Sequence, residues 1–138
     1  MNTYDNPTPV GVHLQRAWTR RHEAGLVIVQ RSDNGQWALP GGYVENGKDA
    51  SLESGAAREF FEETGWAAQA GTLRYSVITP NGKLLAFCTS VFDLYGCSEE
   101  GWTPTEECTA IRIATEAEEL CFPAHTEAMR LWFENPHW

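Results

Sequence analysis

The stretch SLESGAAREFFEETGW, residues 51–66, predicts the helix around which the rest of the chain is organised. Ser51 can cap a helix that begins at Leu52, and Gly65 stands where a left-handed C-terminal cap is expected. At about 100° per residue, the small and apolar residues of this helix share one sector with three glutamates, Glu59, Glu62 and Glu63. The acidic side chains therefore continue the stripe by which the helix would pack on a sheet.

The position of these glutamates favours a bound cation. Glu59 and Glu63 are like charges four residues apart, and all three glutamates lie in the last turns, where the helix dipole disfavours anions. Arg58 can reach Glu62 one turn later and fix the orientation of a carboxylate. Clustered carboxylate oxygens are the ligands that Mg²⁺ and Mn²⁺ prefer. The residues predict a divalent metal site, with a solvated acidic helix face as the alternative.

Most of the remaining chain predicts strands. Val10–Trp18 and Gly25–Gln30 are expected to form a hairpin, and the continuous apolar run 26–29 indicates that its second strand is buried on both faces. Thr115–Leu120 predicts a short helix, and a last helix is expected from Pro123 to about Glu134. Further strands are expected at 37–39, 73–79, 83–94 and 108–113, with a hairpin turn at Asn81-Gly82. The fold class is therefore α/β, with a mixed sheet between helices.

Length and charge limit the classes of protein and ligand. The 138 residues predict a single domain, 1–138, whose first eight residues are flexible. The net charge of -9 disfavours nucleic acid and anionic membranes as partners, so a phosphate-bearing substrate would need a metal ion to hold it. The four cysteines form no C-x-x-C pair, and no apolar run approaches the roughly 20 residues of a membrane-spanning helix. We expect a cytoplasmic protein with reduced thiols.

Residues 40–66 resemble the Nudix box, the signature of the Nudix hydrolase family. The second half of that pattern is matched without a gap by Arg58-Glu59-Phe60-Phe61-Glu62-Glu63-Thr64-Gly65-Trp66. The first half departs from the pattern, because the chain from Gly42 to Arg58 is two residues longer. The position of the first box glutamate holds Ala50 when counted back from Arg58, and Lys48 when counted forward from Gly42. We place the extra residues in the 46–50 loop, where Asp49 could substitute for that glutamate.

The resemblance implies a Nudix-type α/β/α sandwich and assigns roles to the matching positions. It implies that Glu59 and Glu63 are principal metal ligands, that Glu62 binds metal directly or through water, and that the carbonyl of Gly42 is a further ligand. Thr105-Glu106-Glu107 resembles a loop that often supplies another glutamate as base or ligand. We prefer Glu107 to Glu106 because it lies directly before a predicted strand, with solvated loop residues as the alternative. Whether Glu59 or Glu107 is the general base stays open.

The implied activity is that of a pyrophosphohydrolase dependent on Mg²⁺ or Mn²⁺. Its substrate would be a small nucleotide: a nucleoside diphosphate linked to another moiety, such as ADP-ribose or a nucleotide sugar, or a nucleoside triphosphate. The alternatives are a noncatalytic nucleotide-binding regulatory module and an RNA 5′-end pyrophosphohydrolase. The three retained glutamates argue against the first alternative, and the charge of -9 argues against the second. Many relatives are dimers, so a homodimer is one expected assembly.

Several other side chains are weaker candidates for substrate contacts. His13 and His125 are predicted to be structural. The candidates for base stacking are Trp37, Tyr43, Phe87, Trp102 and Trp132, which could equally belong to the core. The candidates for binding a terminal phosphate are Arg16, Arg31 and Arg74, which could equally be ordinary surface charges.

Overall fold

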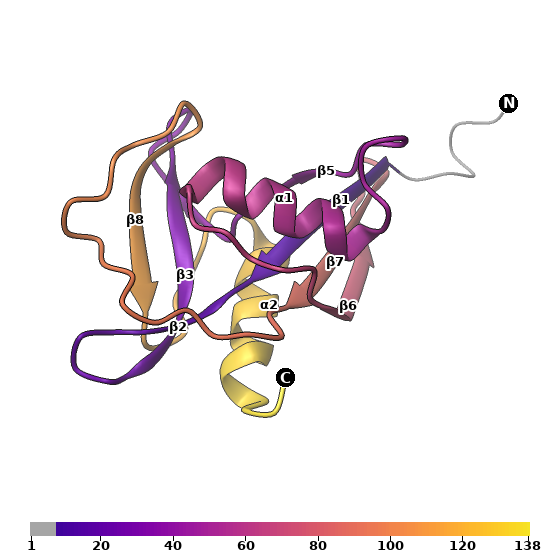
Figure 1. The fold of residues 1–138 in the computed structure, drawn as a ribbon. Coiled ribbons are helices and arrows are strands. Elements are labelled where there is room, and N and C mark those ends of the chain that lie inside the picture. The colour runs from indigo at the N-terminus through magenta and orange to yellow at the C-terminus, as the bar shows by residue number, and fades with distance from the viewer. Residues whose placement is uncertain (1–7) are drawn as a thin grey trace, which may run out of the picture.

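The computed structural model describes residues 8–138, so the expected flexible segment 1–8 lies outside the described residues except for Thr8. The described chain forms eight strands and two helices (Figure 1). In chain order these are β1 (Thr8–Leu14), β2 (Arg16–Trp18), β3 (Ala24–Arg31), β4 (Trp37–Ala38), β5 (Gly41–Tyr43), α1 (Leu52–Thr64), β6 (Thr72–Ile78), β7 (Lys83–Thr89), β8 (Cys108–Ala114) and α2 (Pro123–Glu134).

The strands form two sheets. The first has the order β5-β1-β7-β6 and is mixed, because β1 pairs with β7 in parallel and its other pairings are antiparallel. In the second, β3 pairs antiparallel with β2, β4 and β8. The strand expected over residues 10–18 breaks at Gln15, whose side-chain amide donates to the carbonyls of Arg16 (2.9 Å) and Phe92 (2.8 Å). The chain passes from one sheet to the other at this point.

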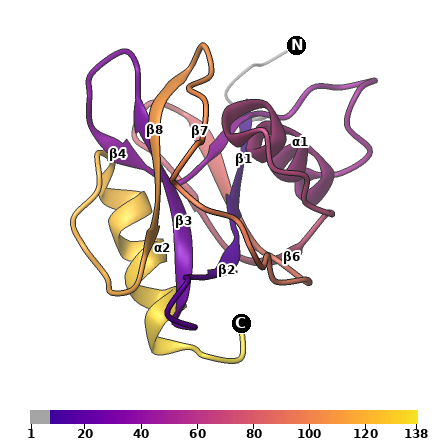
Figure 2. The same cartoon turned by 60° about the vertical axis from the view of Figure 1, so that its left-hand side comes forward.

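The two helices cover opposite faces of the sheets, which confirms the predicted sandwich with a mixed sheet (Figure 2). On β3, Val27 and Val29 pack in a cluster with Phe60 of α1. Leu26 and Ile28 point the other way and pack in a cluster that contains three residues of α2. The strand is therefore buried on both faces, as its continuous apolar run predicts.

Helix α1 begins and ends where the sequence predicts. The Ser51 hydroxyl accepts a hydrogen bond from the Ser54 N–H at 3.0 Å, and Gly65 has a φ of 75° while its N–H donates to the Phe61 carbonyl. The helix lies close against β1, since a Cβ on Gly11 would stand 2.8 Å from the backbone nitrogen of Ala56. Within residues 8–138, no helix is long and apolar enough to cross a membrane.

Two of the predicted elements need correction. Thr115–Leu120 is not helical. Arg112 forms a bidentate ion pair with Glu118, and Leu120 is buried in the core, so these tertiary contacts outweigh the few hydrogen bonds of a single helical turn. The strand expected over residues 83–94 ends at Thr89, where the chain leaves β6 and continues as a loop toward β2.

Candidate active site

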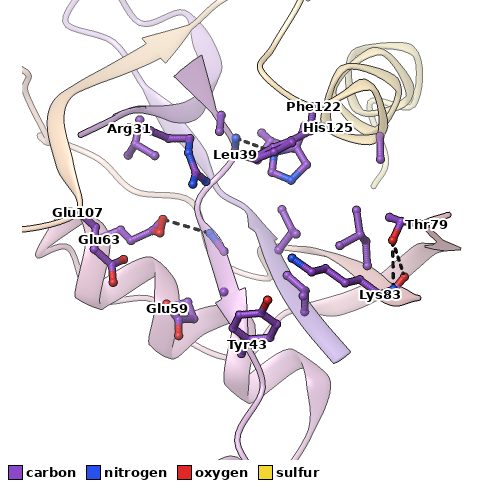
Figure 3. Close-up of a pocket in the computed structure, with 18 of the residues that line it drawn as sticks. Arg31, Leu39, Tyr43, Glu59, Glu63, Thr79, Lys83, Glu107, Phe122 and His125 are labelled. Atoms are coloured by element: carbon purple, nitrogen blue, oxygen red, sulfur yellow. Dashed lines mark hydrogen bonds between the residues drawn. The ribbon is translucent and has the colours of Figure 1, made fainter. Parts of the chain in front are cut away.

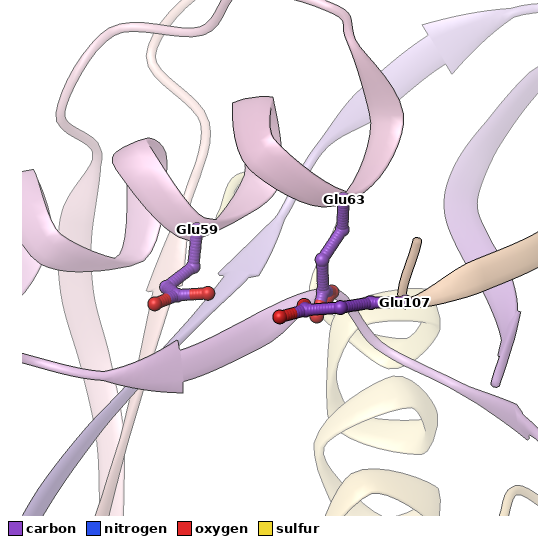
Figure 4. Close-up of side chains that lie close together, drawn as sticks. All are labelled: Glu59, Glu63 and Glu107. Atoms are coloured by element: carbon purple, nitrogen blue, oxygen red, sulfur yellow. The ribbon is translucent and has the colours of Figure 1, made fainter. Parts of the chain in front are cut away.

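Three glutamates from two distant segments meet beside the C-terminal half of α1 (Figure 4). Glu59 and Glu63 come from α1, and Glu107 comes from the residue directly before β8. One carboxylate oxygen of each lies within 4.8 Å of the others. Glu59 and Glu63 are 9% and 8% exposed, whereas Glu107 is exposed to solvent. Such a cluster of negative oxygens is stable only with protons or cations among them.

The electrostatics of the cluster show how strongly it needs a counter-charge. Burial raises the pKa of Glu63 to about 8, the negative charges of Glu107 and Glu59 add to the increase, and a hydrogen bond from the Gly41 N–H (3.1 Å) opposes it. Burial also raises the pKa of Glu59. A hard divalent cation accepts carboxylate oxygens in this arrangement and removes their repulsion. The residues present therefore fit Mg²⁺ or Mn²⁺.

The loop between β7 and β8 places Glu107 by hydrogen bonds to the end of α1. Its Trp102 indole donates to the Thr64 carbonyl at 2.8 Å, and the Thr105 hydroxyl donates to the Glu63 carbonyl at 3.0 Å. These bonds satisfy carbonyls that a helix leaves unpaired in its last turn. Glu106 lines the neighbouring cavity but does not belong to the three-carboxylate cluster.

Arg58 is held on several sides. Its Nε and Nη2 donate to the two carboxylate oxygens of Asp49 at 2.7 and 2.8 Å. Its Nη1 donates to Glu59 at 3.1 Å and to Glu62 at 3.0 Å, and Nη2 also donates to the Tyr43 carbonyl at 3.0 Å. The Asp49 side chain is only 3% exposed, and its contact with the guanidinium lowers the Asp49 pKa to about 2. Arg58 is therefore fixed in an orientation that also holds Glu59.

Glu62 lies outside the cluster. Its side chain is 43% exposed, contacts Arg58, and stands 3.8 Å from the Lys48 ammonium. The prediction that all three glutamates continue the packing stripe is therefore wrong for Glu62, which stands roughly 100° from Glu63 and lies on the flank of the stripe. The structure thus brings Glu59 and Glu63 together with Glu107, and links Glu62 to them only through Arg58.

The glycine pair Gly41-Gly42 brings backbone against the buried glutamates. Besides the Gly41 N–H bond to Glu63, a Cβ at Gly42 would collide with the Glu59 carboxylate. Only glycine therefore fits at position 42 with Glu59 in this orientation.

A cavity of about 1180 Å³ opens beside the cluster (Figure 3). The three glutamates and Gly42 line one side of it. Val10, Leu85 and Val77, from three neighbouring strands of the first sheet, supply apolar lining. Its remaining walls include Arg31, Leu39, Tyr43, Lys83, Phe122 and His125.

Comparison with known proteins identifies the family. A model of the NUDIX domain matches residues 12–134. The chain belongs to the Nudix hydrolase family. A MutT-like protein of Streptomyces ambofaciens is 49% identical over 45 residues, a match that covers 33% of this chain and 28% of that relative. The chain thus matches well under two thirds of that protein's length.

Solved structures show the same Nudix fold. A NUDIX hydrolase from Nitrosomonas europaea has a TM-score of 0.75 and 21% identity, over 96% of this chain and 73% of the other. The NUDIX domain of Shewanella oneidensis NrtR, crystallised with ADP ribose, has a TM-score of 0.75 and 18% identity, over 94% of this chain and 88% of the other. At these identities the likeness concerns the fold.

The departure of this chain from the Nudix box lies in the loop before α1. The position of the first box glutamate holds Ala50 or Lys48, depending on the direction of counting, and Asp49 between them supplies the carboxylate that meets Arg58. Asp49 also accepts a hydrogen bond from the Glu45 N–H at 2.8 Å, which closes the longer loop on itself. Despite the two extra residues, a carboxylate of this loop still binds Arg58, the arginine of the box.

The aromatic and arginine side chains that the sequence offered as weaker candidates fall into two groups, those that line the cavity and those that do not. Of the candidate aromatic and arginine residues, Tyr43 and Arg31 line the cavity. The others do not line it, namely Trp37, Phe87, Trp102, Trp132, Arg16 and Arg74. Lys83 and Phe122 also line the cavity, although the sequence did not mark either of them as a candidate for substrate contact. Strand alternation was the available signal for Lys83, since it shares a strand face with Leu85.

The two histidines predicted to be structural, His13 and His125, are buried. His13 is fully buried, with its Nε2 bonded to the Gln15 side-chain oxygen at 2.8 Å, and burial lowers its pKa. His125 accepts a hydrogen bond from the Leu39 N–H through Nδ1 at 3.1 Å, and burial lowers its pKa to about 3. His125 is thus neutral at the edge of the cavity, where it fixes the backbone leading into the glycine pair.

Proposed function

We propose that this chain is a metal-dependent pyrophosphohydrolase that cleaves a phosphoanhydride bond of a nucleoside diphosphate linked to another moiety, or of a nucleoside triphosphate. The observation that carries the proposal is the cluster of Glu59, Glu63 and Glu107 on one side of a cavity of about 1180 Å³. That volume is slightly larger than that of most ligand pockets, roughly 300–1,000 Å³, and suits a nucleotide with a second moiety. The ADP ribose bound by the Shewanella neighbour supports the same substrate class.

The carboxylates are suited to hold Mg²⁺ or Mn²⁺, in line with the general use of divalent metals in the family. In this proposal Glu59, Glu63 and the Gly42 carbonyl are ligands, and Glu62 acts through water. The metal supplies charge neutralisation on the phosphate oxygens and a lower pKa for bound water. Arg58 holds Glu59 at 3.1 Å and the Gly41 N–H holds Glu63 at 3.1 Å, so both ligands are oriented before substrate binds.

A carboxylate must also take the proton from the attacking water. Glu59 and Glu107 remain the two candidates. The structure favours Glu107, because Glu59 is buried and fixed by Arg58, whereas Glu107 is exposed and has a side chain that solvent water reaches. We therefore assign Glu107 the role of general base, with Glu59 as the ligand that positions the metal.

Hydrolysis of a nucleotide panel tests the proposal. ADP-ribose, nucleotide sugars, dinucleotides and nucleoside triphosphates are incubated with the protein and Mg²⁺ or Mn²⁺, and the products are separated by chromatography. We expect turnover of at least one compound, lost in Glu63→Gln. Glu53→Gln is the matched control, because Glu53 lies in the first turn of the same helix and outside the cavity lining. No turnover of any compound, or undiminished turnover in Glu63→Gln, would refute the enzymatic assignment.

Glu107→Gln separates the base from the ligands. If Glu107 is the base, this variant loses kcat and keeps its dependence on metal concentration, whereas Glu59→Gln requires more metal for half-maximal activity. The opposite pattern would assign the base to Glu59.

A further inference from the structure

Lys83 extends across the first sheet into the cavity. It begins β7, yet its ammonium stands 5.3 Å from the ring centroid of Tyr43, which ends β5. Strand β1 lies between β5 and β7, so the lysine side chain crosses a whole strand to reach the tyrosine. Figure 3 shows Lys83 pointing into the cavity, toward Tyr43 and the side on which Glu59 lies.

The register of the strands explains this direction. Lys83 and Leu85 are two residues apart on β7 and share a face of the sheet. Leu85 pairs with Val10 of β1, and Val10 pairs with Tyr43 of β5. These residues form one row on the cavity side. The alkyl stem of Lys83 can therefore follow apolar surface while its ammonium is held at the aromatic end of the row.

Charge compensation distinguishes Lys83 from the other cation of the cavity. Arg31 is already paired, because its Nε and Nη2 donate to Asp33 at 3.0 and 2.7 Å, and its guanidinium also stacks on Phe122. Within residues 8–138, Lys83 makes no ion pair and contacts the Tyr43 ring instead. Six acidic residues line the same cavity, namely Asp33, Glu45, Glu59, Glu63, Glu106 and Glu107. Lys83 is thus the cation in the described lining whose charge no carboxylate neutralises.

The surroundings of Lys83 make it an effective anion site. Apolar neighbours lower the local dielectric, so a charge held there interacts more strongly than one in bulk water. The cation–π contact with Tyr43 restricts the ammonium before a ligand arrives. A lysine ammonium binds phosphate as a point charge. It does not require the fixed planar geometry by which an arginine guanidinium binds an anion.

We propose that Lys83 binds the phosphate of the substrate that is not held at the Glu59, Glu63 and Glu107 cluster, and that it thereby selects nucleotides with two or more linked phosphates. This inference rests on the proposed function, because it takes the cluster as the site of the first phosphate. The contact exists before and during the reaction. Its loss therefore raises KM and leaves kcat nearly unchanged.

Steady-state kinetics with Lys83→Met, Lys83→Arg and Arg20→Met tests the role of the charge. We expect KM for the best substrate to rise about tenfold in Lys83→Met, with kcat within about twofold of the unmutated protein, and most of the affinity to remain in Lys83→Arg. Arg20→Met removes the same charge from an exposed pair with Glu100, outside the cavity lining, and should leave KM unchanged. Added NaCl should raise KM in the unmutated protein more than in Lys83→Met. An unchanged KM in Lys83→Met would overturn the inference.

Equilibrium binding distinguishes a phosphate contact from mere support of the Tyr43 ring. Titration calorimetry with adenosine, AMP and ADP in Mg²⁺ should show a Kd for ADP about tenfold higher in Lys83→Met, and an unchanged Kd for adenosine. Equal weakening of adenosine and ADP, an ADP Kd independent of Lys83, or no ADP binding to the unmutated protein would overturn the inference. Lys83-dependent ADP binding without hydrolysis of any nucleotide would instead refute the proposed function alone.

Discussion

Replacement of Asp49 tests whether the longer loop supports the arginine of the Nudix box. Asp49→Asn keeps the shape of the side chain and removes the charge that faces the Nε and Nη2 of Arg58 at 2.7 and 2.8 Å. The Asp49 and Arg58 side chains are 3% and 17% exposed, so the pair lies between an exposed pair, about 0–1 kcal/mol, and a fully buried one, for which loss of one partner costs about 3–5 kcal/mol. Arg58 keeps its bonds to Glu59, Glu62 and the Tyr43 carbonyl.

We therefore expect a loss of about 2 kcal/mol in the free energy of unfolding, within the range of about 1.5–3 kcal/mol for a hydrogen bond to a charged group. Because Arg58 also orients Glu59, kcat/KM should fall by about tenfold to a hundredfold, and more metal should be needed for half-maximal activity. Asp49→Glu should recover part of both losses, since it restores the charge at a longer reach.

Urea unfolding followed by tryptophan fluorescence measures the first effect, and steady-state hydrolysis measures the second. Asp33→Asn is the matched stability control. Asp33 pairs with Nε and Nη2 of Arg31 in the same way, at 3.0 and 2.7 Å, but the two side chains are 61% and 37% exposed. Because solvent screens this exposed pair, Asp33→Asn should lower the free energy of unfolding far less than Asp49→Asn does. If Asp49→Asn is no less stable than Asp33→Asn and keeps full kcat/KM, then Asp49 does not support the site.

Four further predictions rest on residues that line the cavity. Gly42→Ala should lower kcat/KM at least about tenfold, because the new Cβ displaces the Glu59 carboxylate, and unchanged kinetics would contradict the fit around position 42. In EDTA, Glu63→Gln should be more stable than the unmutated protein at pH 9. The pKa of Glu63 is about 8 in the folded state and about 4.5 in the unfolded state, so the unmutated protein loses stability as the pH rises from about 4.5 to about 8. A glutamine at this position does not ionise, and the variant avoids this loss. Mg²⁺ should raise the unfolding midpoint of the unmutated protein and have little effect on Glu63→Gln, whereas equal responses would argue against Glu63 as a ligand. His125→Asn should lose less stability than the unmutated protein when the pH falls from 7 to 5. The reason is that the unfolded state binds a proton near pH 6.5, whereas folded His125, with a pKa of about 3, does not. Urea unfolding measures this contribution, which is at most about 1.4 kcal/mol per pH unit, and equal pH slopes for the two proteins would refute it.

Local features of the fold could be predicted from the sequence because neighbouring residues produce them. The Ser51 cap, the Gly65 cap and the apolar spacing between them define α1, and the run 26–29 defines the doubly buried strand β3. The helix predicted over Thr115–Leu120 was wrong for the opposite reason. Its local signals are weak, and the Arg112–Glu118 ion pair with the burial of Leu120 decided the conformation.

The sequence of residues 51–66 by itself determined that Glu59 and Glu63 share the packing face of one helix, because helical geometry fixes the angle between residues four apart. The resemblance to the Nudix family pointed to Glu107 and Asp49, but only the tertiary structure decided that Glu107 joins the two glutamates of α1, that Glu62 stands aside and that Asp49 meets Arg58. It also carried Lys83 across a strand to Tyr43. These contacts join residues far apart in the chain or across a loop of unusual length, so they depend on how loops and sheets pack, which no short pattern of residues encodes.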